Sequence, residues 1–222
     1  MSSIDQLDTA TREQIAALDL RAKPLIICDV DEVLLKFIES LEQYLDRNGY
    51  WLDKKSFALN GNIKHHGGHD PADTDKVRNL IYSFFAEETA NLTLVDGACE
   101  ALDALSGHAE IVLLTNMPDR FRDARLENLI NHGIHHPVVT NIGPKGPAAI
   151  EISRKAGNPV FFLDDTPGNV KSVKTALPDA HIIHFIADSC FAELVENIDG
   201  VSLRSSDWPE TLEHIVSLLE QN

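Results

Sequence analysis

The fold is decided by the stretch LIICDVD at residues 25–31, where four apolar residues are followed by Asp29 and Asp31. Two later stretches have the same form, IVLLT at residues 111–115 and VFFLDD at residues 160–165. Continuous apolar runs of this length are typical of strands buried on both faces of a parallel sheet. Ligands bind at the carboxyl ends of such strands, so we expect these polar side chains to meet in one site.

The expected site is crowded with acidic side chains. Asp29, Asp31, Asp164 and Asp165 all follow buried strands. Two carboxylates about 4 Å apart repel each other by about 4 kcal/mol at an effective dielectric near 20. Oxygen ligands in this number indicate a hard divalent cation, and an open carboxylate site favours Mg²⁺ over Ca²⁺. Helix capping explains any one of these aspartates, but it does not explain the set.

Length and composition restrict the class of protein. The chain has 222 residues, of which 43% are hydrophobic, so we expect one core domain with an insertion. Its three cysteines have no metal or redox spacing and indicate a reducing compartment. The formal charge of -16 disfavours nucleic acid and anionic membranes as partners. The first residues lack the pattern of a secretory signal, and we expect a cytoplasmic protein.

Strand and helix patterns alternate regularly through the second half of the chain, which predicts an α/β fold with a Rossmann-like, three-layer parallel-sheet core. Between residues 36 and 95 apolar residues recur instead at helical spacing, on either side of Gly-rich breaks. We therefore expect residues 1–35 and 96–222 to form the catalytic core and residues 36–95 to form a small, mainly helical cap. The expected strands of the core are residues 25–28, 111–115, 137–140, 160–164 and 181–185.

Four short motifs, taken in order, resemble those of the haloacid dehalogenase superfamily. They are the string ICDVDEVL at residues 27–34, the run that ends on Thr115, the lysine Lys145 and the acidic pair at 164–165. The resemblance extends over residues 24–185 and depends on the order and spacing of the motifs. In that superfamily a helical cap over the active site often follows the first motif, where this chain has its insertion.

The first motif departs from the superfamily pattern at one point. Glu32 and Val33 stand where Gly-Thr is the commoner pair. This departure affects the turn out of the first strand more than the expected chemistry. Superfamily members that cleave carbon–halogen or phosphonate bonds lack an acid at the position of Asp31, so the presence of Asp31 favours phosphate esters.

The resemblance implies a magnesium-dependent phosphomonoester hydrolase that acts through an aspartyl-phosphate. Asp29 would attack phosphorus, and Asp31 would protonate the leaving oxygen and then activate water. Thr115 would hold a phosphoryl oxygen, and Lys145 would neutralise the nucleophile and the developing charge.

The resemblance also implies a set of Mg²⁺ ligands. We expect the side chains of Asp29 and Asp164 and the backbone carbonyl of Asp31 to bind the ion directly, with Asp165 orienting them. The expected substrate is a small phosphorylated metabolite, because a lid that excludes water favours a substrate that fits wholly beneath it. The sequence identifies neither that metabolite nor the oligomeric state.

Two assignments have alternatives. Lys155 lies on the same predicted helix as Lys145, but Lys145 stands at the helix start, where a cation opposes the helix dipole and stability alone would not select it. Asn116 and Asn169 are candidate secondary contacts, and turn or cap chemistry explains them equally well.

Three histidines, His65, His66 and His69, flank Gly-Gly in the insertion. A metal site is disfavoured because no second set of ligands accompanies them. We expect them instead to contact the substrate at the rim of the crevice, where an imidazole can donate a hydrogen bond to the leaving group.

Other functions remain open. A phosphotransferase or phosphomutase of the same superfamily would use the same residues. A phospho-receiver signalling domain places its paired acids before the phosphorylated aspartate, whereas here the pair at 164–165 comes last. A silent binding domain on the same scaffold would not need the complete set of acidic and basic residues.

Overall fold

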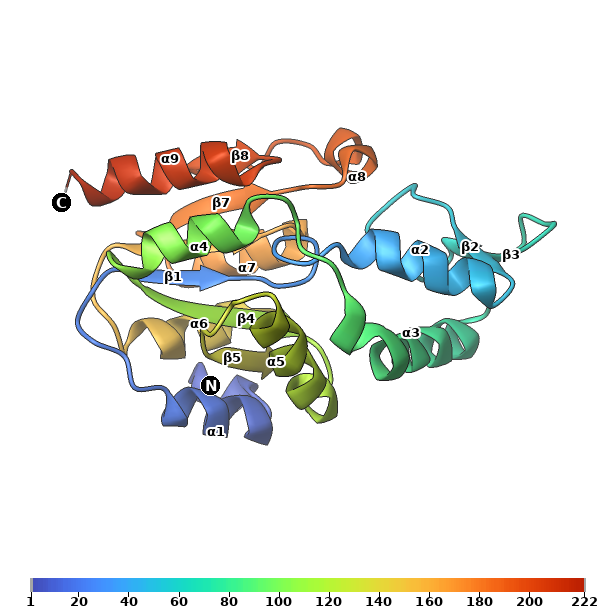
Figure 1. Ribbon diagram of the computed structural model, residues 1–222, viewed down its shortest axis with the longest axis horizontal. Helices are drawn as coiled ribbons and strands as arrows, with labels where there is room; N and C mark the ends of the chain where they lie inside the picture. Colours follow the sequence, from blue (N-terminus) through green and yellow to red (C-terminus); the bar gives the residue numbers. More distant parts are fainter. Residues whose placement is uncertain (1, 222) are drawn as a thin grey trace.

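A parallel sheet forms the centre of the protein, for which the computed structural model describes residues 2–221 (Figure 1). Within these residues the sheet has six strands in the order β5-β4-β1-β6-β7-β8, and all neighbouring strands are parallel. The predicted α/β fold is therefore confirmed, although the short edge strand β8 was not predicted. The strands are β1 (Leu25–Cys28), β4 (Glu110–Asn116), β5 (Val138–Asn141), β6 (Val160–Asp164), β7 (His181–Phe185) and β8 (Leu203–Ser205).

The register of the three central strands brings their carboxyl ends to one level. Cys28, the last residue of β1, pairs with Leu113 of β4 on one side and with Leu163 of β6 on the other. The amide of Asp29 then donates to the carbonyl of Leu163 at 2.9 Å. The polar residues that follow the three strands therefore start from neighbouring positions.

Side chains alternate between the two faces of the sheet, and each face has its own helical layer. In β1, Ile26 and Cys28 pack on one face, and Leu25 and Ile27 pack on the other. Complete burial of each leucine or isoleucine side chain contributes about 1.5–3 kcal/mol to the free energy of unfolding. The first face is covered by α4 (Ala98–Ser106), α5 (Arg122–Asn131) and α9 (Trp208–Leu219), and the second by α1 (Thr9–Ala17), α6 (Gly146–Ser153) and α7 (Pro167–Ala176).

The chain leaves the core after β1, forms the segment of residues 36–95 and returns to the core before α4. Figure 1 shows the helices of this segment beyond one end of the sheet. At its base the two connections lie side by side, because the amide of Lys36 donates to the carbonyl of Thr93 and that of Val95 to Leu34. The antiparallel hairpin of β2 and β3 was not predicted. The division into core and cap stays a prediction. The elements of the segment are α2 (Phe37–Arg47), β2 (Tyr50–Leu52), β3 (Ile63–His65), α3 (Thr74–Glu88) and the 3-10 helix η2 (Thr89–Asn91).

Helix α8 (Ser189–Leu194) belongs to the core, and side chains at this helix contact the inserted segment. Its N-cap residue Asp188 forms an ion pair with Lys54 at 3.0 Å, and the ring of Phe191 lies 4.7 Å from the ring of Phe57. Two short 3-10 helices, η1 (Ile4–Gln6) and η3 (Asp119–Phe121), complete the described elements. In residues 2–221, no helix combines the length and the apolar character that a membrane span requires.

The C-terminal helix α9 is anchored by Trp208, which is fully buried. Its indole N–H donates to the carbonyl of Val33 at 2.9 Å, and its ring lies 5.3 Å from that of Phe185. Val33 belongs to the loop that follows β1. The helix therefore supports the loop that carries Asp29 and Asp31.

We predict that Trp208→Ala lowers the free energy of unfolding by about 3–5 kcal/mol, because it leaves a large cavity and removes the donor to Val33. The matched control is Trp51→Ala, which removes the other tryptophan of the chain, a partly exposed one in β2, and should cost only about 1 kcal/mol. Urea unfolding followed by far-UV circular dichroism measures both. Equal losses in the two variants would show that Trp208 has no special structural role.

Candidate active site

The structure brings together the predicted catalytic and metal-binding residues at the carboxyl end of the sheet. Lys145 lies 2.7 Å from both Asp29 and Asp164, and the hydroxyl of Thr115 donates to Asp31 at 3.4 Å. Carboxylate oxygens of Asp29, Asp164 and Asp165 all lie within 4.8 Å of one another. Residues from four separate stretches of the sequence thus form one constellation, whose catalytic roles remain predictions.

The ammonium group of Lys145 is completely buried between two carboxylates. Burial alone lowers the pKa of a lysine, but the carboxylates of Asp164 and Asp29 outweigh this effect, so the pKa of Lys145 lies above its usual range. The lysine is therefore charged at any physiological pH. It holds one positive charge beside the side chain of Asp29.

Asp29 uses one carboxylate oxygen for its contacts. Its Oδ1 accepts hydrogen bonds from the backbone amide of Val30 and from Lys145, both at 2.7 Å. Burial raises the pKa of Asp29 to about 7; Lys145 opposes this shift, and the charge of Asp164 adds to it. These contacts fix the orientation of the carboxylate and occupy Oδ1 rather than Oδ2.

The two acids at the end of β6 have different surroundings. Both oxygens of Asp164 accept hydrogen bonds, Oδ1 from the amide of Thr166 and Oδ2 from Lys145, and the amide of Asn169 reaches both at 3.2 Å. Asp165 accepts a hydrogen bond from the hydroxyl of Thr166 at 3.0 Å and lines the neighbouring cavity. Burial raises the pKa of Asp165 well above its usual value, and the negative charge of Asp164 adds to this shift.

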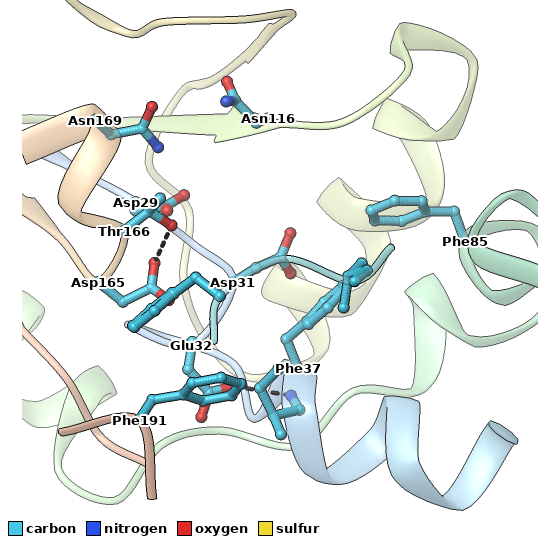
Figure 2. Close-up of a pocket in the computed structure, with 13 residues that line it drawn as sticks. Asp29, Asp31, Glu32, Phe37, Phe85, Asn116, Asp165, Thr166, Asn169 and Phe191 are labelled. Carbon is cyan, nitrogen blue, oxygen red and sulfur yellow. Dashed lines mark hydrogen bonds between the residues drawn. The ribbon is translucent and has the colours of Figure 1, made fainter. Parts of the chain in front are cut away.

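A cavity of about 240 Å³ lies beside these carboxylates (Figure 2). Figure 2 shows Asp31 near its middle, with Asn116 and Asn169 on one side and the rings of Phe37 and Phe191 on the other. The aromatic side of this cavity was not predicted from the sequence. The residues that line it are Asp29, Asp31, Glu32, Phe37, Ile38, Phe57, Leu59, Phe85, Asn116, Asp165, Thr166, Asn169 and Phe191.

Arg125 of α5 is a residue of the site that sequence reasoning missed. Its side chain is completely buried, and one guanidinium nitrogen donates to Oδ1 of Asp31 at 2.6 Å. Burial raises the pKa of Asp31, and the charge of Arg125 opposes this shift. Helical periodicity could have found Arg125, because it stands four residues before the buried Leu129 and so lies on the core-facing side of the helix.

The structure shows what Glu32 does at the end of the first motif, where the sequence departs from the superfamily pattern. Its backbone has a φ of 63°, a left-handed conformation that costs a side-chain-bearing residue about 1–2 kcal/mol. In return, its carboxylate accepts a hydrogen bond from the amide of Ile38 in the first turn of α2 at 2.8 Å. Burial raises the pKa of Glu32 to about 7. Glycine would adopt this turn without that cost. Glu32 instead connects the loop after β1 to the inserted segment through its hydrogen bond with Ile38.

The structure does not bring His65, His66 and His69 to this cavity, which none of them lines. The hairpin of β2 and β3 carries them elsewhere in the inserted segment. The ring of His65 lies 4.8 Å from that of Tyr50, and Nε2 of His66 lies 3.3 Å from a carboxylate oxygen of Asp46. Aromatic residues occupy the side of the cavity where the histidines were expected.

The remaining candidates are placed clearly. Asn116 lines the cavity, and its amide donates to the carbonyl of Gly143 at 2.9 Å. Lys155, the alternative to Lys145, donates to the carbonyls of Ile15 and Ala16 at the end of α1. It therefore stabilises the end of that helix and does not reach the carboxylates.

No family model and no curated protein sequence matches the chain. Solved structures do match its fold. A magnesium-bound protein of Bacillus subtilis, YfnB, which is described as a HAD-hydrolase, is 15% identical with a TM-score of 0.61, and the match covers 88% of this chain and 99% of that one. A HAD family hydrolase from Deinococcus radiodurans with bound phosphate and sodium is 14% identical with a TM-score of 0.56, over 90% and 97% of the two chains.

A third match is a protein from Bacteroides vulgatus described as a β-phosphoglucomutase, 14% identical with a TM-score of 0.55 over 95% of this chain and 97% of that one. The chain therefore has the fold of the haloacid dehalogenase-like hydrolases, and the resemblance inferred from the motifs is confirmed for the fold.

We predict that Lys145→Met lowers the free energy of unfolding by about 3–5 kcal/mol, because it leaves two buried carboxylates without their counter-ion. Adding Asp164→Asn should restore part of this loss, since one of the two charges is then removed. The matched control is Lys155→Met, expected to cost about 1 kcal/mol or less. Denaturant titration tests the ranking, and a Lys155 variant as unstable as the Lys145 variant would contradict it.

Proposed function

We propose that the protein is a magnesium-dependent phosphomonoester hydrolase of the haloacid dehalogenase superfamily, acting on a small phosphorylated metabolite. The observation that carries this proposal is the fully buried Lys145 between Asp29 and Asp164, with Asp31 beside the cavity. This arrangement joins a carboxylate nucleophile, a fixed positive charge and a candidate proton donor.

The donor set fits Mg²⁺, because carboxylate oxygens of three aspartates gather within 4.8 Å. Asp29 and Asp165 line the cavity, whereas both oxygens of Asp164 already accept hydrogen bonds. We therefore favour Asp165 over Asp164 as a direct ligand, the reverse of the order expected from the sequence, and keep the backbone carbonyl of Asp31 as a third. When bound, the ion would neutralise phosphoryl charge and orient the substrate.

Asp29 would act through Oδ2, since its Oδ1 is held by Val30 and Lys145. Attack on phosphorus forms the aspartyl-phosphate bond and breaks the bond between phosphorus and the ester oxygen. Lys145 would stabilise the negative charge that develops on the phosphoryl group, because its ammonium group already lies beside the nucleophile.

Asp31 would give its proton to the leaving oxygen. It would then take a proton from a water whose oxygen attacks phosphorus, which breaks the bond between phosphorus and Asp29 and releases inorganic phosphate. Arg125 and Thr115 both bind its carboxylate, at 2.6 and 3.4 Å, and so set its orientation toward the cavity. Burial raises the pKa of Asp31, which suits a group that must be protonated before it acts. We regard Arg125 as a positioning residue, since its only described polar contact is with Asp31.

A phosphotransferase or phosphomutase is the second candidate. Transfer of the phosphoryl group from Asp29 to a hydroxyl acceptor instead of water would need the same residues, and one structural neighbour is described as a β-phosphoglucomutase. Analysis of the reaction products separates the two, because a hydrolase releases inorganic phosphate and a transferase yields a second phosphate ester.

We predict that Asp29→Asn abolishes phosphate release, because the amide keeps the shape of the side chain but is no nucleophile. Removal of Mg²⁺ with a chelator should abolish the activity of the unaltered protein, and added Mg²⁺ should restore it. Asp179→Asn, at an exposed position after α7, is the control and should keep full activity. A colorimetric phosphate assay suffices, and near-normal turnover by the Asp29 variant would exclude the covalent mechanism.

We predict that Asp31→Asn lowers turnover by a factor of about 10² to 10⁴, the usual contribution of a positioned proton donor. Aryl phosphates should lose least in the phosphorylation step, since their leaving groups need little protonation. Single-turnover measurements with an aryl and an alkyl phosphate make this comparison. If both substrates lost the same factor, Asp31 would not be the acid.

A further inference from the structure

Polar and apolar side chains both line the cavity beside the carboxylates. Figure 2 shows Asp29 and Asn169 on one side of Asp31, and the rings of Phe37 and Phe191, with Glu32 between them, on the other. The acidic residues that line it are Asp29, Asp31, Glu32 and Asp165. No lysine or arginine is among the described residues that line the cavity. The apolar side consists of Phe37, Ile38, Phe57, Leu59, Phe85 and Phe191.

The apolar side is built by contacts between the inserted segment and the core. The ring of Phe57, from the insertion, lies 4.7 Å from the ring of Phe191, from α8 of the core. Beside them, Lys54 forms ion pairs with Asp188 at 3.0 Å and with Glu42 at 2.9 Å. This apolar side, called the wall below, is therefore held in place by aromatic packing and by ion pairs between residues that do not line the cavity.

Asp31 shows which part of a substrate meets this wall. As the proposed acid it must lie next to the leaving oxygen, so the leaving group extends from Asp31. On one side of Asp31 lie Asn116 and Asn169, and on the other the rings of Phe37 and Phe191 (Figure 2). With the phosphoryl group near Asp29 and Lys145, the leaving group contacts the rings.

We infer that the substrate is a small phosphate monoester whose leaving group is apolar and carries no second anionic group. This inference rests on the proposed function. The hydroxyl groups of a sugar would lose their hydrogen bonds with water against aromatic rings. A second carboxylate or phosphate would find no cation in the lining to replace its water. The volume of about 240 Å³ lies below the range of about 300–1,000 Å³ for drug-sized ligands, which favours a compact group.

Two matched pairs of substrates test the inference on the unaltered protein with Mg²⁺. Benzyl phosphate and 4-carboxybenzyl phosphate share a leaving oxygen and differ in one charge. Propyl phosphate and glycerol 3-phosphate differ in two hydroxyl groups, and glycerol is the better leaving group of the two. We expect kcat/KM to be higher for the apolar member of each pair by about tenfold or more.

Variants of the wall show whether it causes this preference. Phe191→Ala should lower kcat/KM for benzyl phosphate by about tenfold, and by less for methyl phosphate, which has no group to contact the ring. Leu194→Ala, at an exposed position of the same helix, is the control. Phe191→Arg should raise the activity on 4-carboxybenzyl phosphate relative to benzyl phosphate. Phe57→Arg, at a half-buried position across the ring pair, makes the same test if the first variant does not fold.

The outcomes separate this inference from the proposed function. If glycerol 3-phosphate and 4-carboxybenzyl phosphate are hydrolysed as well as their apolar partners, the inference is wrong and the phosphatase assignment stands. If phosphate is released from none of the esters, including methyl phosphate, the proposed function itself fails. A preference that persists unchanged in Phe191→Ala and in Phe57→Ala would also overturn the role of the wall.

Discussion

The rest of the site depends on the ion pairs of Lys145 with Asp29 and Asp164. A buried charge is costly unless it is paired, so each of these three side chains depends on the others to be buried in its charged form. The pairing needs β1 and β6 to be neighbours, as the sheet order makes them. It also needs α6 to begin close to α7: a Cβ on Gly146 would lie only 2.7 Å from the carbonyl oxygen of Ser172, so glycine alone permits the approach that places Lys145.

The loop after β1 joins the chemistry of the core to the inserted segment. Asp31 is bound by Arg125 from one side, while Glu32 accepts a hydrogen bond from the first turn of α2. Trp208 of α9 supports the same loop, because its indole N–H donates to the carbonyl of Val33. The loop therefore contacts α5, α9 and the first turn of α2 within a few residues. The left-handed backbone of Glu32 accompanies this hydrogen bond to α2.

The sequence predicted the fold and the polar cluster because both follow from local patterns: apolar runs define the buried strands, and the residue after each run is fixed by its position. Lys145 was preferred over Lys155 on the same basis, from its place at a helix start. The walls of the cavity could not be predicted in this way. The placement of His65, His66 and His69 away from it depends on the β2–β3 hairpin, and the packing of Phe57 on Phe191 joins residues that are far apart in the chain. Arg125 could be predicted only in part. Helical periodicity places it on the buried face of α5, but the sequence does not show that its partner is Asp31.

The proposed covalent mechanism at Asp29 is tested most directly by an attempt to trap a phosphorylated form of the protein. During turnover of benzyl phosphate with Mg²⁺, the reaction is stopped in acid and treated with borohydride, which reduces an acyl phosphate to an alcohol. Peptide mass spectrometry then locates the altered side chain. The mechanism predicts this reduction at Asp29, at a level that depends on substrate, and its loss in Asp29→Asn. Reduction at Asp31, Asp164 or Asp165 instead, or active turnover with every aspartate unaltered, would contradict it.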